Sequence, residues 1–147
     1  MLRVSSIEQS GWQLILWAKN KKGYHNLCKI VSESFMDECY YRRPRIDKEL
    51  LREFHEGIIC SSACLGGEIS QKVMEGLLQS ASQPFEERFK AAIEAVDWFK
   101  SIFGDDYYLE IQRHQTDKEG ADQMVYQCEK TLGEIGDKID AADKASI

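Results

Sequence analysis

WQLILWA, residues 12–18, decides the fold class, because a strand formed by this stretch is apolar on both of its faces. Such strands are typical of a sheet that helices cover on each side. The polar residues at 20–23 end the strand, and apolar side chains then recur at helical spacing from Tyr24 to Phe35. The stretch therefore predicts an α/β fold in which a buried strand leads into a helix.

The rest of the chain continues this alternation. Asp47 is an expected N-cap, Gly57 ends the helix that follows it, and Pro84 suits the first turn of a long amphipathic helix. We predict a short helix after residue 47, a strand at 58–60, helices at 68–78 and 84–103, a strand at 107–112 and a helix at 121–131.

This order is typical of parallel strands joined by right-handed crossover helices. Three strands cannot close a barrel, and they leave the edges of the sheet open. We therefore expect an incomplete section of a larger α/β fold.

Composition limits the classes of protein that fit. The chain has 147 residues, enough for one domain with a real core, and 43% of them are hydrophobic. It shows neither a membrane-length apolar run nor a signal peptide, and its five cysteines lack the spacing of a disulfide framework. These features predict a cytoplasmic protein without a membrane partner.

The net charge of -6 argues against a free-standing nucleic-acid binder, because phosphate contacts need clustered Lys and Arg. Arg42, Arg43 and Arg45 form the one local exception, around Pro44. They are candidates for phosphate contact, although most such short clusters are solvated surface loops.

Candidate site residues lie where the expected strands end, because sites in parallel α/β sheets form at the carboxyl ends of strands. Cys64 and His114 follow successive strands and so could share one pocket. A thiolate and an imidazole suit zinc or another borderline metal. The three ends offer Lys19 and Asn20, then Ser61, Ser62 and Cys64, then Arg113 and His114.

Two other interpretations stay open for Cys64. A single cysteine near a strand end more often fills a core than binds a metal, and a lone histidine such as His114 is more often a hydrogen-bonded surface residue. A cysteine nucleophile would need a base beside it, and neither His25 nor His55 is clearly positioned for that role.

Several ordered blocks also carry a family resemblance. LILWAKNKKGYHNLCKIVS, YYRRPRIDKELL, EGIICSSACLGGEI and IFGDDYYLEIQRH resemble consecutive segments of the PHP (polymerase and histidinol phosphatase) domain at the start of bacterial DNA polymerase III alpha subunits, most closely the Bacteroidetes type. The likeness covers roughly residues 11–128. We accordingly expect an N-terminal extension at 1–10, a partial PHP domain at 11–130 and a divergent, partly frayed tail at 131–147.

The resemblance implies a section of a distorted (β/α)7 barrel whose strand ends carry metal ligands, with zinc or manganese in an intact site. Cys64 matches a ligand position of the family. Gln13 stands where the family places a ligand histidine, and an amide is a poor replacement for imidazole. The chain also lacks the family's H-x-H, D-H and D-x-H motifs, so we expect a vestigial metal site. Cys64 and His114 should point toward the carboxyl-end face, and Gln13 should project from the first strand.

The resemblance further implies DNA replication as the process. The full-length relative is a DNA-directed DNA polymerase, a nucleotidyltransferase that uses magnesium, and it alone would contact DNA. For this segment we expect no catalytic residues and a structural or docking role, with the rest of the alpha chain and the proofreading exonuclease subunit as partners. The alternative is a metal-dependent phosphoesterase or 3'-5' exonuclease of the PHP family.

Overall fold

The computed structural model of the chain describes residues 2–4, 11–36, 39, 43–111, 130–135 and 137. Within these ranges, none of the helices combines the length and the apolar character that crossing a membrane requires. The described residues form one mixed sheet with helices packed against it, which makes the chain an α/β protein as the sequence predicts.

The sheet has five strands in the order β3-β1-β2-β4-β5. The pair β1 and β3 is parallel, and so is the pair β4 and β5, whereas β2 runs antiparallel to both of its neighbours, β1 and β4. The strands span Leu2–Val4 (β1), Trp12–Ala18 (β2), Arg45–Ile46 (β3), Ile58–Ser61 (β4) and Tyr107–Tyr108 (β5).

The prediction of parallel strands throughout is therefore wrong for β2. β2 pairs antiparallel with β1 in the register Leu2↔Leu14 and Val4↔Trp12, and antiparallel with β4 in the register Ile15↔Ser61 and Ala18↔Ile58. Sequence patterns missed β1 and β3 because strands of three and two residues are too short to show a period. The third predicted strand, 107–112, is also shorter than expected and ends at Tyr108.

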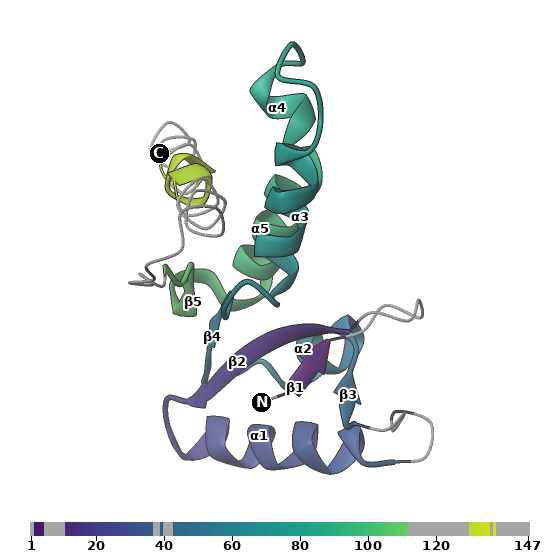
Figure 1. Cartoon of the computed structure of the whole chain (residues 1–147). Coiled ribbons are helices and arrows are strands. Elements are labelled where there is room, and N and C mark those ends of the chain that lie inside the picture. The colour runs from purple at the N-terminus through teal and green to yellow at the C-terminus, as the bar shows by residue number, and fades with distance from the viewer. Residues whose placement is uncertain are drawn as a thin grey trace, which may run out of the picture.

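Two helices begin with side-chain caps that the local sequence supplies. The Asn20 side chain accepts a hydrogen bond of 2.9 Å from the Gly23 N–H at the start of α1 (Lys21–Ser34). The Asp47 carboxylate accepts one of 2.8 Å from the Leu50 N–H, which confirms the predicted N-cap of α2 (Lys48–Phe54). Figure 1 shows α1 running along the sheet beside β2, to which it packs.

The long helix predicted at 84–103 is broken at Phe89, where φ is -108° and ψ is 11°. The break lies at the closest approach to α3, because a Cβ atom on Gly76 would stand 2.5 Å from the Phe89 ring and 2.6 Å from the Arg88 carbonyl oxygen. Figure 1 shows α3 (Glu68–Leu77), α4 (Phe85–Arg88) and α5 (Lys90–Phe103) standing above the sheet, and a 3-10 turn at Gly104–Asp106 follows α5.

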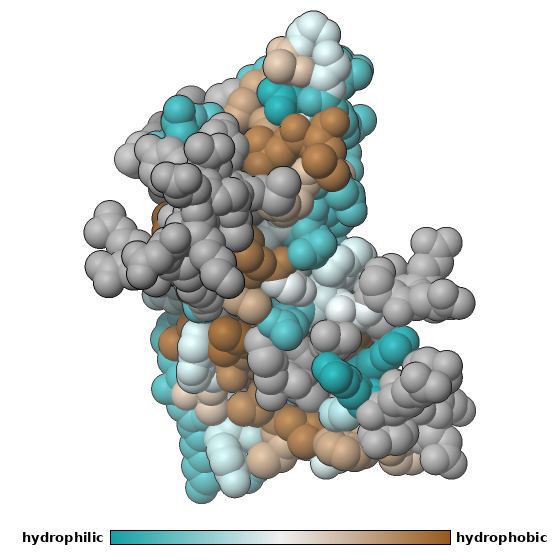
Figure 2. Space-filling view, viewed as in Figure 1, coloured by the Kyte–Doolittle hydropathy of each residue, from teal (hydrophilic) through white to brown (hydrophobic). Residues whose placement is uncertain are grey.

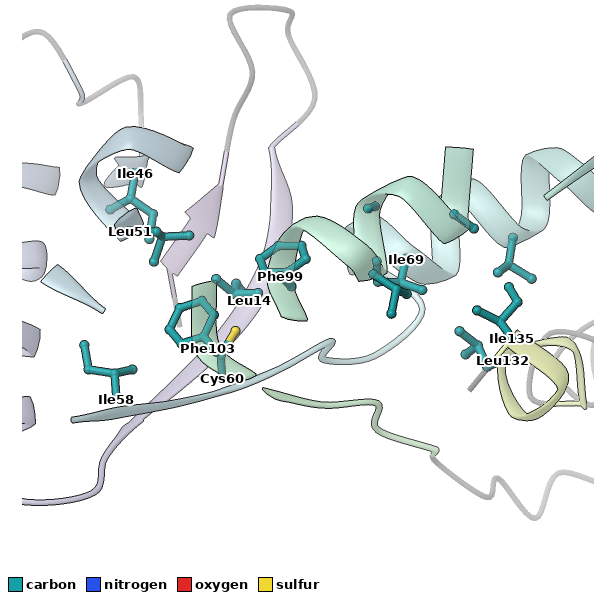
Figure 3. Close-up of a cluster of buried hydrophobic side chains, with 14 of the residues drawn as sticks. Leu14, Ile46, Leu51, Ile58, Cys60, Ile69, Phe99, Phe103, Leu132 and Ile135 are labelled. Carbon is teal, nitrogen blue, oxygen red and sulfur yellow. The ribbon is translucent and has the colours of Figure 1, made fainter. Parts of the chain in front are cut away.

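The core lies between one face of the sheet and α5. Leu14 from β2 and Cys60 from β4 face Phe99 and Phe103 of α5 (Figure 3). The opposite face of β2 is open, since Trp17 is 48% exposed. The expectation that residues 12–18 are buried on both faces is therefore wrong, because the core helices cover the side chains of only one face.

Helical residues 130–135 also contribute to this core. Leu132 and Ile135 are buried, and both belong to the same apolar cluster as Ile69 of α3. Figure 3 shows the two side chains on the side of their helix that faces the chain's other core residues. This part of the C-terminal region thus helps to cover the helices that stand above the sheet.

The Gly76 contact predicts a sharp difference between two helical glycines. Gly76→Ala pushes a methyl group against the Phe89 ring and the Arg88 carbonyl, and should lower the free energy of unfolding by about 1–3 kcal/mol. Gly133→Ala is the matched control, because no described residue outside its own stretch of helix has an atom within 4 Å of its Cβ position. That change should stabilise the protein by about 0.5–1 kcal/mol. Urea unfolding measures both, and equal effects of the two substitutions would contradict the packing.

Candidate functional site

Because β2 runs antiparallel to β4, its first residues lie at the end of the sheet where β4 and β5 terminate. Ile15 pairs with Ser61, and Gln13 forms an isolated parallel bridge with Gly67 beyond the end of β4. The Gln13 N–H donates a hydrogen bond of 2.8 Å to the Gly66 carbonyl oxygen. Gln13 therefore stands over the loop that joins β4 to α3.

Gln13 and Cys64 are in direct contact at this edge. The Cys64 thiol donates a hydrogen bond to Gln13 Oε1, with 2.8 Å between sulfur and oxygen. Gly66 leaves the room for the amide, since a Cβ atom there would lie 3.0 Å from Gln13 Cδ and Oε1. The result is a pair of one donor and one acceptor at the end of the sheet.

The loop that carries Cys64 is tightly wound. Ala63, which is buried, has φ of 60°, a left-handed conformation that side-chain-bearing residues rarely adopt. The Gly67 N–H donates to the Cys64 carbonyl oxygen at 2.8 Å, and a Cβ atom on Gly67 would collide with the Ser62 carbonyl oxygen. These constraints fix the direction of Cys64 relative to β4.

Ser61 and Ser62, which the sequence placed among the strand-end candidates, anchor the chain that follows β5. The Ser61 hydroxyl donates to Glu110 Oε2 at 2.8 Å, and the Glu110 N–H donates to the Ser62 hydroxyl at 2.9 Å. Both serines are buried. Sequence reasoning missed Glu110, although its place just after an expected strand was the signal that could have found it.

Glu68, the first residue of α3, follows the Cys64 loop directly and is held by two lysines. Its side chain is only 4% exposed, and its Oε1 atom accepts from Lys48 at 3.0 Å and from Lys72 at 3.1 Å. The Lys48 ammonium also lies 4.7 Å from the centre of the Trp98 ring, and that of Lys72 lies 5.8 Å from the Trp12 ring. This cluster, in which Glu68 is buried and both lysines are partly exposed, joins α2, α3, α5 and β2.

Lys19 and Asn20 do not belong to the site, contrary to the prediction. They follow β2 at the opposite end of the strands, where the Lys19 N–H donates to the Gly57 carbonyl oxygen just before β4. The Lys19 ammonium pairs with Asp106 at 2.7 Å, and this hydrogen bond raises the pKa of Lys19. The prediction failed because it assumed that the first strand runs parallel to the others.

The remaining candidates are Arg42, Arg43, Arg45, Arg113 and His114. Arg113, His114 and Arg42 lie outside the described residues, so a shared site of Cys64 and His114 stays a prediction. Arg43 is exposed, and Arg45 lies in β3 at the far edge of the sheet, so their phosphate contact also stays a prediction.

The histidines expected on helices do not supply a base for Cys64. His25 is exposed on α1, next to Tyr24. His55 Nδ1 lies 2.7 Å from the Arg52 carbonyl oxygen, and the ring packs edge-on against Phe103.

The donor set does not fit zinc or manganese. A metal site normally takes at least three protein ligands, and no group of three His, Cys, Asp or Glu side chains in the described part of the chain is arranged to hold an ion. At Cys64 the neighbour is the Gln13 amide, whose oxygen accepts a hydrogen bond from the thiol. Cys60 offers no second thiolate, because burial raises the pKa of its thiol and keeps it protonated.

Comparison with known proteins settles the family. The profile of the PHP domain matches residues 2–114, which is most of the chain. The chain belongs to the PHP domain family. It is 46% identical over 103 residues to the DNA polymerase III subunit alpha of Borreliella burgdorferi, and 43% identical over 106 residues to that of Campylobacter jejuni. It is 40% identical over 112 residues to that of Deinococcus radiodurans.

These matches cover 70%, 70% and 76% of this chain, but the chain spans only 8% of the length of each relative. The PHP domain is thus the shared part. The domain limits expected at residues 10 and 130, and the Bacteroidetes-type lineage, stay predictions from the sequence.

The Cys64–Gln13 pair predicts the response to a thiol-seeking metal. Titration of the reduced chain with Co²⁺ should give no thiolate charge-transfer absorption that depends on Cys64, because the thiol has an amide and not an imidazole beside it. Cys64→Ala should therefore leave the titration unchanged, as should Cys28→Ala, which removes an exposed cysteine and serves as the control. A saturable absorption band that is lost only in Cys64→Ala would contradict the conclusion that these residues do not suit a metal ion.

Proposed function

We propose that the chain serves as part of the PHP domain of a replicative DNA polymerase III alpha subunit. Its role there is structural, and its metal site is vestigial. The observation that carries the proposal is the Cys64–Gln13 hydrogen bond, because it joins a position that resembles a family ligand to an amide. The family match over residues 2–114 supports the parent assignment.

The open face of the sheet supports a role within a larger assembly. By the strand registers, Ile15, Trp17, Ile59 and Tyr108 share this face, and none of them belongs to the core cluster. Trp17 and Tyr108 are 48% and 54% exposed. Figure 2 shows that apolar residues also reach the surface in several patches. We propose that the rest of the alpha chain covers the open face.

The edges of the sheet support the same proposal. The outer strands β3 and β5 have only two residues each, and no other strand of the described residues pairs along their outer sides, where further strands could be added. Added strands at both edges would extend the sheet toward the (β/α)7 barrel that the resemblance implies.

The parent activity is polymerisation of DNA, with magnesium and DNA bound elsewhere in the alpha chain, in the cytoplasm. Docking of the proofreading exonuclease subunit is proposed on the resemblance alone. For the alternative, a metal-dependent phosphoesterase or 3'-5' exonuclease, the described residues supply no suitable donor set.

A segment exchange tests the proposal. The 103 residues of the Borreliella burgdorferi subunit that align with this chain are replaced by those of this chain, and primer extension by the purified chimera is measured. The chimera should fold and retain polymerase activity, because the segment contributes architecture and not catalytic groups. The same exchange with the Campylobacter jejuni segment is the control. An inactive or insoluble chimera beside an active control would contradict the proposal.

A further inference from the structure

Helix α1 carries an apolar stripe that faces solvent. Tyr24, Cys28, Val31 and Phe35 are spaced by four, three and four residues, so they lie on one flank of the helix and its C-cap. All four residues are exposed, Tyr24 by 60% and Phe35 by 58%. Figure 2 shows apolar surface where α1 runs along the bottom of the view. A contiguous apolar surface of this kind is typical of a site of protein association.

The stripe is separate from the open face of the sheet. Ile30 of α1 belongs to the core cluster, so α1 lies on the core side of the sheet. A second flank of α1 faces α2, because the Lys29 ammonium lies 5.0 Å from the centre of the Phe54 ring. At about 100° per residue, the stripe lies on the flank that is turned away from α2. A partner that packs on the stripe therefore competes with neither α2 nor a cover of the open face.

The charges of α1 oppose the dipole of the helix. Lys21 and Lys22 stand in its first turn and Glu33 stands in its last. The amino-terminal end of a helix carries partial positive charge and the carboxyl-terminal end partial negative charge, so neither placement is favourable within α1 itself. Lys21 comes three residues before Tyr24 and so lies at one end of the stripe. A helix packed antiparallel on this flank would bring its negative end to Lys21, and the charge pattern therefore favours an antiparallel helical partner.

The spacing of the stripe suits a second copy of α1. The intervals of four, three and four residues read the same in both directions. A second α1 laid antiparallel on the first therefore places Tyr24 opposite Phe35, and Cys28 opposite Val31. Such self-complementary surfaces form two-fold symmetric contacts. We propose that two copies of this chain associate through an antiparallel pair of α1 helices. This contact is independent of the role proposed for the chain in a polymerase.

Sedimentation equilibrium of the reduced chain tests the association. The wild-type chain should form a reversible dimer. Phe35→Glu should raise the dissociation constant of that dimer by at least about tenfold, because the two-fold axis introduces the charge twice into an apolar contact. Leu78→Glu is the matched control, since Leu78 is 77% exposed but belongs to the end of α3, and it should leave the constant unchanged. A monomeric wild-type chain, or equal effects of the two substitutions, would overturn the proposal.

Disulfide mapping tests the direction of the helix pair. Val31→Cys places a second thiol opposite Cys28 of the other copy. Under mild oxidation this variant should form a covalent dimer, and peptide mapping should join Cys28 of one chain to position 31 of the other. A covalent dimer joined between identical positions, Cys28 to Cys28 or position 31 to position 31, would indicate parallel helices and would overturn the proposal.

Discussion

The pairing of β2 between β1 and β4 is the constraint on which the rest of the structure depends. Because β2 is antiparallel to both neighbours, its amino-terminal end lies at the end of the sheet where the other four strands terminate. The register Ile15↔Ser61 then places Gln13 over the loop after β4. The same register sends Leu14 and Leu16 to the core face and leaves Trp17 on the open one, since side chains alternate along a strand. A shift of one residue would exchange the two faces.

The site at this edge is precise in its geometry but limited in its chemistry. A left-handed Ala63 and a glycine without space for a side chain hold Cys64 against Gln13, while the buried Glu68 fixes the helix that follows. The product of this construction is a thiol–amide contact. Such a contact fixes a loop, and the described residues bring neither two further metal ligands nor a base to Cys64. The geometry therefore favours an architectural role for a segment that belongs to the PHP domain family.

Features encoded by neighbouring residues could be predicted from the sequence. The Asp47 cap, the position of α3 and the α/β class follow from local spacing and capping chemistry. Features set by distant partners could not. The direction of β2 depends on its pairing with β1 and β4, the break at Phe89 lies against Gly76 in another helix, and the Cys64–Gln13 contact depends on both strand direction and register. The family resemblance marked Cys64 and Gln13 separately, whereas their contact required the fold.

The most direct test of this account is the direction of β2 relative to β4 in solution. Lys19 donates to Gly57, so hydrogen-bonded pairs alternate along the ladder and Leu16 and Cys60 form one of the closely spaced, non-hydrogen-bonded pairs. A nuclear Overhauser experiment on the labelled chain should show a strong cross peak between the α-protons of Leu16 and Cys60. Absence of that peak, together with inter-strand contacts typical of parallel pairing between β2 and β4, would contradict the account.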